Sequence, residues 1–173
     1  MPEIYFTSDL HFSHENIIRY CYRPFSCADE MNEKLISNWN ELVRDKDEVY
    51  VLGDVVWFAS DLDLLDRMRG KKYLILGNHD NKNASYKKYY QWVEKLETIK
   101  INKQKIVLCH YPMRAWDGSF HGSWHLHGHV HSRPHEWTKD RSLDVGVDKW
   151  GYFPVHYDVV KDYLSSRELH TRE

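Results

Sequence analysis

Five short runs of branched and aromatic residues in this chain each end in side chains that can bind a metal ion or move a proton. The runs read IYFTSDL, EVYVLGDV, KYLILGNHD, KIVLCHY and WHLHGHVH. Branched and aromatic residues favour strands, and reactive residues at strand ends gather where the carboxyl ends of neighbouring strands meet. We therefore expect an α/β sandwich whose strand ends converge on one rim.

Helical patterns separate the first three runs and predict the order β-α-β-α-β. Ser13 is expected to cap a helix that runs through Tyr20, and Ser60 with Asp63 forms a capping box that Gly70 closes. The other expected elements are a helix capped by Asp29 that buries Met31, Leu35, Trp39 and Leu42, a helix carrying Tyr86, Tyr89, Tyr90 and Val93, a hairpin turning at Asn102 and Lys103, a strand at SLDVGV and a helix at YDVVKDYL.

Length and charge predict one domain over residues 1–173. A chain of 173 residues buries roughly two-thirds of the surface that it exposes when unfolded. Its net charge of -2 argues against binding long nucleic acid through phosphate contacts alone, and leaves the oligomeric state open. The sequence shows neither a signal peptide nor an apolar stretch of about 18 residues, so we expect a cytoplasmic protein without membrane contact. Its 3 cysteines lack paired spacing and are expected to be free, buried thiols.

The strand ends carry a set of side chains of the types that bind metals. Carboxylate oxygens, imidazole nitrogens and an amide oxygen suit borderline first-row ions better than ions that prefer thiolates. The donors are too many for one tetrahedral zinc ion but suit two ions that share a carboxylate. Glycines 53, 77 and 128 each precede a ligand directly, where a side chain would crowd the site. The side chains gathered at the strand ends are Asp9, His11, Asp54, Asn78, His79, Asp80, His110, His129 and His131.

The blocks D-x-H, G-D, G-N-H-D, a strand-end H and G-H-x-H, in this order from Asp9 to His131, resemble the signature of the calcineurin-like metallophosphoesterases. The stretches SDLHFSHENII and HYPMRAWDGSFHGSWHLHGHVH are also similar to small single-domain bacterial, archaeal and phage members. The resemblance implies a four-layer αββα sandwich of two mixed β-sheets flanked by helices. It also implies hydrolysis of a phosphoester by a hydroxide that bridges two metal ions.

The same resemblance implies a role for each residue of the centre. Manganese is the expected metal, with iron, zinc or nickel as alternatives. His79 is expected to reach the phosphate and act as the general acid, and Asp80 is expected to orient it. The resemblance assigns Asp9, His11 and His131 to one ion and Asn78, His110 and His129 to the other, with Asp54 shared by both.

Further polar side chains are candidates for the substrate groove. Imidazole and guanidinium groups bind phosphate, and an indole can stack on a base. Each also has a structural interpretation, because a tryptophan can anchor the core and a charged residue is often simply solvated. The substrate candidates are His14, Arg23, Arg114, Trp116 and His121. We expect His127 to support the site or fill the core, and Asp144 and Asp148 to finish a strand or hold a histidine.

Three functions fit this sequence. The first is a dimetal-dependent phosphoesterase, a phosphodiesterase or phosphatase that hydrolyses a phosphodiester or a small nucleotide or phosphomonoester. The alternatives are a sequence-tolerant nuclease and a non-catalytic interaction module on the same fold. The complete ligand set and His79 favour an enzyme, while the near-neutral charge disfavours a nuclease. The choice between monoester and diester depends on the shape of the groove and stays open.

Overall fold

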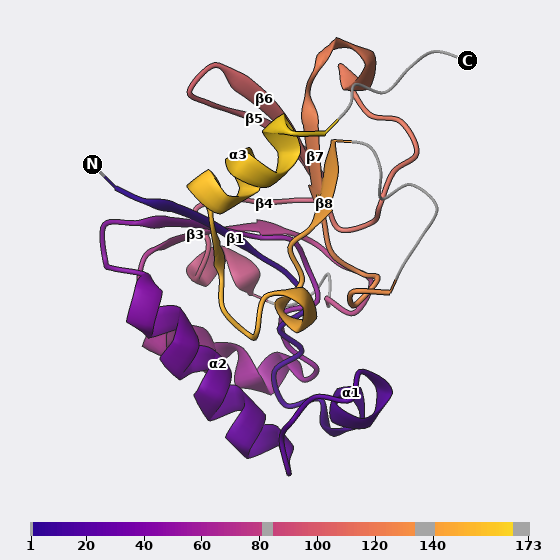
Figure 1. The fold of residues 1–173 in the computed structure, drawn as a ribbon. Coiled ribbons are helices and arrows are strands. Elements are labelled where there is room, and N and C mark those ends of the chain that lie inside the picture. Colours follow the sequence, from indigo (N-terminus) through magenta and orange to yellow (C-terminus); the bar gives the residue numbers. More distant parts are fainter. Residues whose placement is uncertain (1, 81–84, 134–140, 168–173) are drawn as a thin grey trace.

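The computed structural model describes residues 2–80, 85–133 and 141–167, which form two β-sheets (Figure 1). The first sheet has the strand order β4-β3-β2-β1-β9 and the second the order β5-β6-β7-β8. The strands of the first sheet are β1 (Ile4–Thr7), β2 (Glu48–Val51), β3 (Lys71–Ile75), β4 (Val93–Glu94) and β9 (Val155–His156), and those of the second are β5 (Leu96–Ile101), β6 (Gln104–Cys109), β7 (Trp124–His127) and β8 (Ser142–Asp144).

Both sheets are mixed, and each presents the carboxyl ends of its parallel strands at one edge. In the first sheet β1, β2, β3 and β4 run parallel and β9 antiparallel. In the second, β6, β7 and β8 run parallel and β5 antiparallel. A parallel bridge between Ser8 and Gly146 joins the segments that follow β1 and β8. The loops that follow the parallel strands of both sheets therefore meet at one rim.

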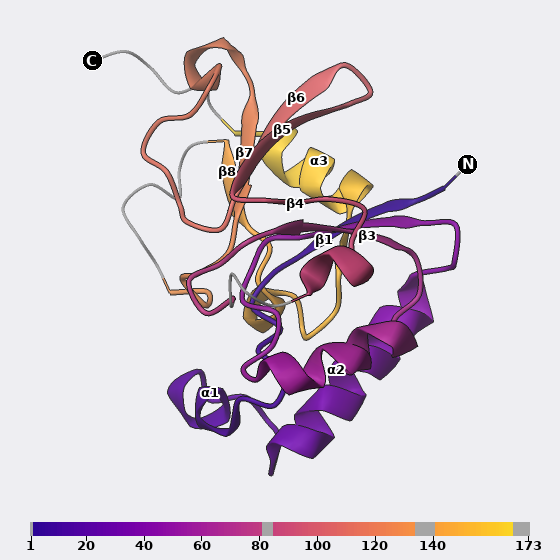
Figure 2. The same cartoon turned by 180° about the vertical axis from the view of Figure 1, so that it is seen from behind.

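Helices cover the first sheet on its outer face. Figures 1 and 2 show α2 (Ala28–Leu42) on the side of β1 and β3 that faces away from β7 and β8. Leu35 and Trp39 of this helix belong to a core cluster that also contains Val51 of β2. Burying a large apolar side chain contributes about 1.5–3 kcal/mol. The 3-10 helix η1 (Ala59–Arg67) adds further leucines to the same cluster.

A second cluster fills the space between the two sheets. Phe6 of β1 lies there with Leu108 of β6 and Leu126 of β7, and all three are fully buried. Helix α3 (Tyr157–Ser165) lies against β9, β1 and β8 and adds Val160 to this cluster. The two mixed sheets with their flanking helices confirm the expected α/β sandwich.

The outer face of the second sheet carries His125 and His127 of β7, both buried as alternate residues of one strand. The Trp116 ring lies 5.2 Å from that of His125, and the Met113 N–H donates to His125 Nε2 at 3.2 Å. The segment 111–123 therefore covers this face, with the short 3-10 helix η3 (Ser119–His121) as its regular element. His127 fills the core, as expected.

The prediction of a helix around Tyr86 is wrong. The chain forms one 3-10 turn, η2 (Tyr86–Lys88), and then pairs with the edge of β3 as strand β4. The Leu74 N–H donates to the Trp92 carbonyl at 3.1 Å. Hydrogen bonding to a sheet edge and burial of the tyrosine ring outweigh the local helical pattern here.

The expected helix starts are also shifted. The N-cap of α1 (Glu15–Tyr20) is His14 rather than Ser13, that of α2 is Cys27 rather than Asp29, and that of η1 is Phe58 rather than Ser60, and none of these side chains makes a capping hydrogen bond. Tertiary contacts therefore hold these helix starts. The expected hairpin between β5 and β6, the strand at β8 and the helix α3 are confirmed.

The remaining chain-wide expectations concern thiols and membranes. Cys21, Cys27 and Cys109 are free, as expected, but only Cys109 is buried. Across the described residues, the structure holds no helix that combines the length and the apolar character needed to span a bilayer.

Candidate metal centre

The rim where the two sheets meet is built from backbone in the left-handed conformation. A positive φ is uncommon for a residue with a side chain, and such residues concentrate at functional sites. The Asp9 N–H donates to the Gly53 carbonyl at 3.0 Å and the His11 N–H to the Asp54 carbonyl at 2.9 Å, which ties the loops after β1 and β2 together. The predicted ligands with φ between 48° and 72° are Asp9, His11, Asp54, His129 and His131.

Two groups of donors converge at this rim. Asp9, His11 and His131 form one group, and Asp54, His110 and His129 form the other, with the ligand atoms of each group within 4.8 Å of one another. Asp54 Oδ2 lies 3.5 Å from His11 Nε2 and 3.4 Å from His110 Nε2, so this carboxylate stands between the groups.

Two further contacts complete the arrangement. Asn78 adds its side-chain oxygen beside the second group, 3.0 Å from His110 Nε2. The His129 N–H donates to both carboxylate oxygens of Asp9, at 3.2 and 3.0 Å, and so links one group to the other. The structure thus brings all the predicted ligands together.

The chemistry of these donors fits two cations. Asp9 and Asp54 are buried carboxylates with 0% and 2% exposure, and buried charges require a counter-charge. His11 Nε2 is buried and has no hydrogen-bond partner among the described residues. A buried imidazole nitrogen without a partner costs free energy that coordination to a cation would recover. These donors therefore fit the two metal ions that their residue types predict.

A family model described as calcineurin-like phosphoesterase matches residues 2–170. The chain belongs to this family. An uncharacterised protein of Methanocaldococcus jannaschii is 40% identical over 168 residues, which cover 92% of this chain and 90% of that protein. The Gene 66 protein of Mycobacterium phage L5 is 27% identical over an alignment of 213 positions, which covers 99% of this chain and 100% of the phage protein.

Solved structures show the same fold. The crystal structure of a protein of unknown function from Aquifex aeolicus superposes with a TM-score of 0.80 at 24% identity, over 94% of this chain and 100% of that chain. An archaeal phosphodiesterase superposes with a TM-score of 0.53 at 16% identity, over 83% of this chain and 82% of its own. Metal-dependent hydrolysis of phosphoesters is the activity of the calcineurin-like phosphoesterase family.

The ion pair between Arg23 and Asp148 lies beside the candidate metal centre and positions His131. Asp148 Oδ2 lies 2.8 Å from His131 Nδ1, which leaves Nε2 of that ring facing Asp9. Arg23 donates to both carboxylate oxygens of Asp148 at 2.8 and 2.9 Å, and to the carbonyls of Asp9 and Leu10. The expectation that Asp148 holds a histidine agrees with this contact.

Charge coupling sets the protonation of the centre. Burial raises the pKa of Asp9 to about 6, and nearby histidines offset only part of that rise. Burial also raises the pKa of Asp54, but the hydrogen bond and charge of His110 outweigh it and hold the pKa at about 2. Burial lowers the pKa of His131, but the hydrogen bond to Asp148, together with Cys21 and the charge of Asp9, outweighs burial and raises the pKa to about 10. A cation that binds His131 must therefore displace a proton at neutral pH.

Two glycines leave room for the carboxylates of the centre. A Cβ added at Gly77 would lie 2.6 Å from the Asp54 nitrogen and would overlap Asp54 Oδ1. A Cβ added at Gly128 would overlap Ser8 Oγ and Asp9 Oδ2. Real Cβ atoms do not approach other atoms this closely, so the expectation that glycine prevents crowding beside the ligands agrees with the geometry.

Asp80 anchors the turn that carries His79, and its expected role in orienting the His79 ring stays a prediction. Its carboxylate accepts hydrogen bonds from the backbone N–H groups of Asp54, Val55 and Gly77 at 2.7 to 2.9 Å, and from the Tyr86 hydroxyl at 3.1 Å. Among the contacts of the described residues, none joins Asp80 to the His79 ring. Asp80 therefore fixes the turn between β3 and the loop after β2, because a carboxylate that accepts several N–H groups is a strong anchor.

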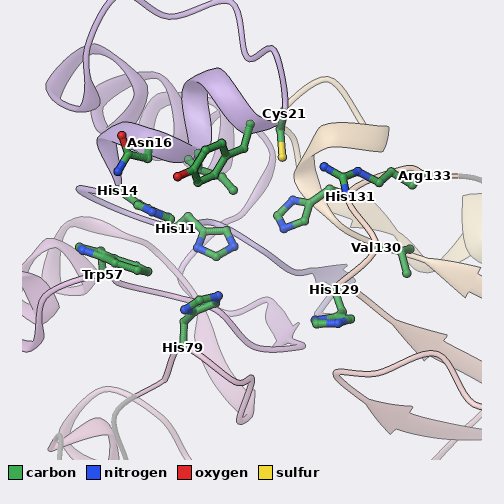
Figure 3. A pocket seen from close by; sticks show the side chains of 12 residues that line it. His11, His14, Asn16, Cys21, Trp57, His79, His129, Val130, His131 and Arg133 are labelled. Carbon is green, nitrogen blue, oxygen red and sulfur yellow. The ribbon is translucent and has the colours of Figure 1, made fainter.

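A cavity of about 610 Å³ opens above the centre (Figure 3). The rings of His11, His79, His129 and His131 border it and point toward a common space. His14 lies on its wall, as predicted for a substrate-contacting residue. The other residues on its walls are Asn16, Ile17, Tyr20, Cys21, Trp57, Val130 and Arg133.

Four of the substrate candidates do not line this cavity. Arg23 is only 4% exposed and is occupied by Asp148, so its role is structural. Trp116 is 8% exposed and packs on His125, which agrees with the structural interpretation of this residue. Arg114 and His121 are exposed, away from the residues that border the cavity.

Trp57 and Arg133 are two of the seven cavity residues that were not predicted from the sequence. Trp57 follows the G-D block by only three positions, and Arg133 follows His131 by two. Proximity to ligand-bearing blocks was the available signal. Neither residue stands out by type alone, because isolated Trp and Arg residues occur throughout the chain.

Proposed function

We propose that this chain is a two-metal phosphoesterase that acts on a phosphodiester or a small nucleotide, with a phosphomonoester as the alternative substrate. The observation that carries the proposal is the convergence of two donor groups on the shared carboxylate of Asp54, beneath a cavity bordered by five imidazoles. Mixed oxygen and nitrogen donors support manganese as the first choice of metal, with iron, zinc and nickel as alternatives.

In this proposal the seven ligands divide as the sequence blocks do. Divalent cations bound at such a centre neutralise phosphate charge and lower the pKa of water. One ion would be held by Asp9, His11 and His131 and the other by Asn78, His110 and His129, with Asp54 shared between them.

His79 has the position of a proton donor. Its ring is exposed in the cavity and lies 5.4 Å from the ring of His11. Its backbone N–H donates to Asp54 Oδ1 at 2.9 Å, so the main chain that carries the ring is fixed relative to the shared carboxylate. We propose that His79 binds the phosphate and protonates the departing oxygen, which requires this kind of fixed geometry.

Metal analysis combined with a substrate screen tests the proposal. Protein reconstituted with manganese and then desalted should carry two ions per chain and hydrolyse at least one member of a panel of monoesters, diesters and cyclic nucleotides. Asp54→Ala should lower the metal content at both sites and abolish turnover. Asp63→Ala, which removes an exposed carboxylate of η1, is the matched control and should change neither. One ion or none in the wild type, or no turnover of any substrate, would contradict the proposal.

A further inference from the structure

Trp57 and His14 form a stacked pair on one wall of the cavity. Their ring centroids are 3.7 Å apart and their planes differ by 6°. The Trp57 backbone is fixed because its N–H donates to the Phe12 carbonyl at 2.9 Å, beside a parallel bridge between Phe12 and Val56. His14 is 6% exposed, whereas Trp57 is 41% exposed. The imidazole of His14 therefore packs against one face of the Trp57 indole, and the exposed surface of the indole lies away from His14.

The second face of the indole carries no ring of the described residues. His79 lies 5.3 Å from Trp57 and 6.3 Å from His14. Together with the separation of 3.7 Å between Trp57 and His14, these distances form a triangle with nearly a right angle at Trp57. Because His14 sits directly over one face, His79 lies beside the edge of the indole rather than over its other face. That other face is left for a flat ligand next to the proposed proton donor.

The rest of the cavity suits a ligand that joins a flat ring to a phosphate. Its volume of about 610 Å³ falls within the range of pockets for small organic ligands. None of the described residues that border it is an aspartate or a glutamate. Arg133 lies across the cavity from Trp57, beside His131 (Figure 3). The histidines and this guanidinium favour an anion, and the indole favours an aromatic ring.

We propose that Trp57, backed by His14, is the platform on which the base of a nucleotide substrate stacks while its phosphate lies at the metal centre. This inference rests on the proposed function and narrows its substrate class to phosphoesters of nucleosides. Stacking of a base on an aromatic side chain contributes about 1–3 kcal/mol, which corresponds to roughly 5- to 150-fold in affinity. Trp57 is then a specificity-determining residue, separate from the metal ligands.

Equilibrium binding of two matched ligands to the manganese-loaded protein tests this platform. Adenosine monophosphate and ribose 5-phosphate carry the same sugar and phosphate, and only the first carries a base. By calorimetry, the wild type should bind adenosine monophosphate more tightly than ribose 5-phosphate. Trp57→Ala should weaken the binding of adenosine monophosphate about 5- to 150-fold and change the binding of ribose 5-phosphate less than about 2-fold. Trp57→Phe should restore part of the lost affinity.

Phe58→Ala is the control, because Phe58 is the next residue, is 55% exposed and does not border the cavity. It should leave both affinities unchanged. Three results would contradict the proposed stacking platform. They are an equal loss of affinity for both ligands in Trp57→Ala, no loss of affinity for either ligand, and equal affinity of the wild type for the two ligands. Failure of the proposed function is a separate result: base-dependent binding that requires Trp57 would support the platform even if no phosphoester in the screen were hydrolysed.

Discussion

The backbone of His79 is bound to Asp54, and the carboxylate of Asp80 anchors the same turn. The N–H of His79 is bound to Asp54, while the Asp80 carboxylate is occupied by other backbone groups and by Tyr86. The ring is therefore free to turn toward a phosphate, and its distance from the shared ligand is limited by the main chain. The proposed proton donation by this ring and the proposed cation binding by its neighbours should therefore be separable by mutation.

His79→Ala should keep both metal ions and the fold while lowering kcat about 10²- to 10⁴-fold, the range of a positioned general acid. The loss should be larger for a substrate with an alkoxide leaving group than for a nitrophenyl ester, because nitrophenolate departs with little protonation. Steady-state kinetics on such a substrate pair, after metal analysis, checks this. His121→Ala removes an exposed histidine that does not border the cavity and serves as the control. Loss of a metal ion in the His79 variant would refute this division of roles.

At the scale of elements, the loops after the parallel strands act as one assembly. The loops after β1, β2 and β7 contain residues in left-handed backbone conformations. Backbone hydrogen bonds join the loop after β1 to the loop after β2, and the loop after β7 to the loop after β6. Asp80 extends this assembly, because its carboxylate joins the loop after β3 to the loop after β2. A change in the backbone of one loop should therefore alter ligands carried by another.

Gly77→Ala tests this coupling. Gly77 does not need a positive φ, but its added Cβ would overlap the carboxylate of Asp54, so the variant should lose bound manganese at both sites. Gly151→Ala is a contrasting control, because this glycine has a φ of 61° and no atom within 4 Å of an added Cβ. Strain there should cost about 1–2 kcal/mol of stability and leave the metal content unchanged. Equal metal content in both variants, measured by elemental analysis, would argue against coupling between the loops.

At the scale of the whole molecule, a buried imidazole links the second sheet to the segment that covers it. His125 Nδ1 lies 3.1 Å from the Val107 carbonyl, and its Nε2 accepts the Met113 N–H at 3.2 Å. Nε2 also lies 3.2 Å from the Tyr111 carbonyl. The contact with the Met113 N–H requires the neutral ring, in which Nδ1 donates and Nε2 accepts. Burial, with a smaller contribution from His127, lowers the pKa of His125 to about 4.

The fold should therefore lose stability in acid through His125. Between pH 6.5 and about 4 the unfolded chain binds a proton at this position and the folded chain does not, so the free energy of unfolding falls as pH falls. The loss should approach ~3 kcal/mol, from 1.36 kcal/mol per pKa unit. Urea unfolding of the metal-free protein across this range should show a steeper pH dependence for the wild type than for His125→Gln. Identical slopes would mean that His125 is not responsible.

The sequence by itself determined the strands that carry the chemistry and the set of candidate ligands. Branched and aromatic runs have a strong local preference for strands, and parallel strands present their carboxyl ends at one edge, so the positions of residues such as Asp9 and Asp54 along the chain are enough to assign them to one rim. The positions of Gly77, His129 and His131 at the ends of strands were assigned by the same reasoning. Local chemistry and position along a strand were sufficient here.

The tertiary structure alone decided which groups those residues meet. The segment after Tyr86 has a helical sequence pattern but forms a strand, because it makes hydrogen bonds to the edge of β3. Arg23 and Asp148 lie 125 positions apart in the chain, so their ion pair is invisible to any local pattern. Trp57 gains its place on the cavity wall only because the loop after β2 pairs with the loop after β1 and stacks it on His14. Contacts between distant segments depend on the packing of the whole chain, and a side chain's type fixes only which contacts it is able to make.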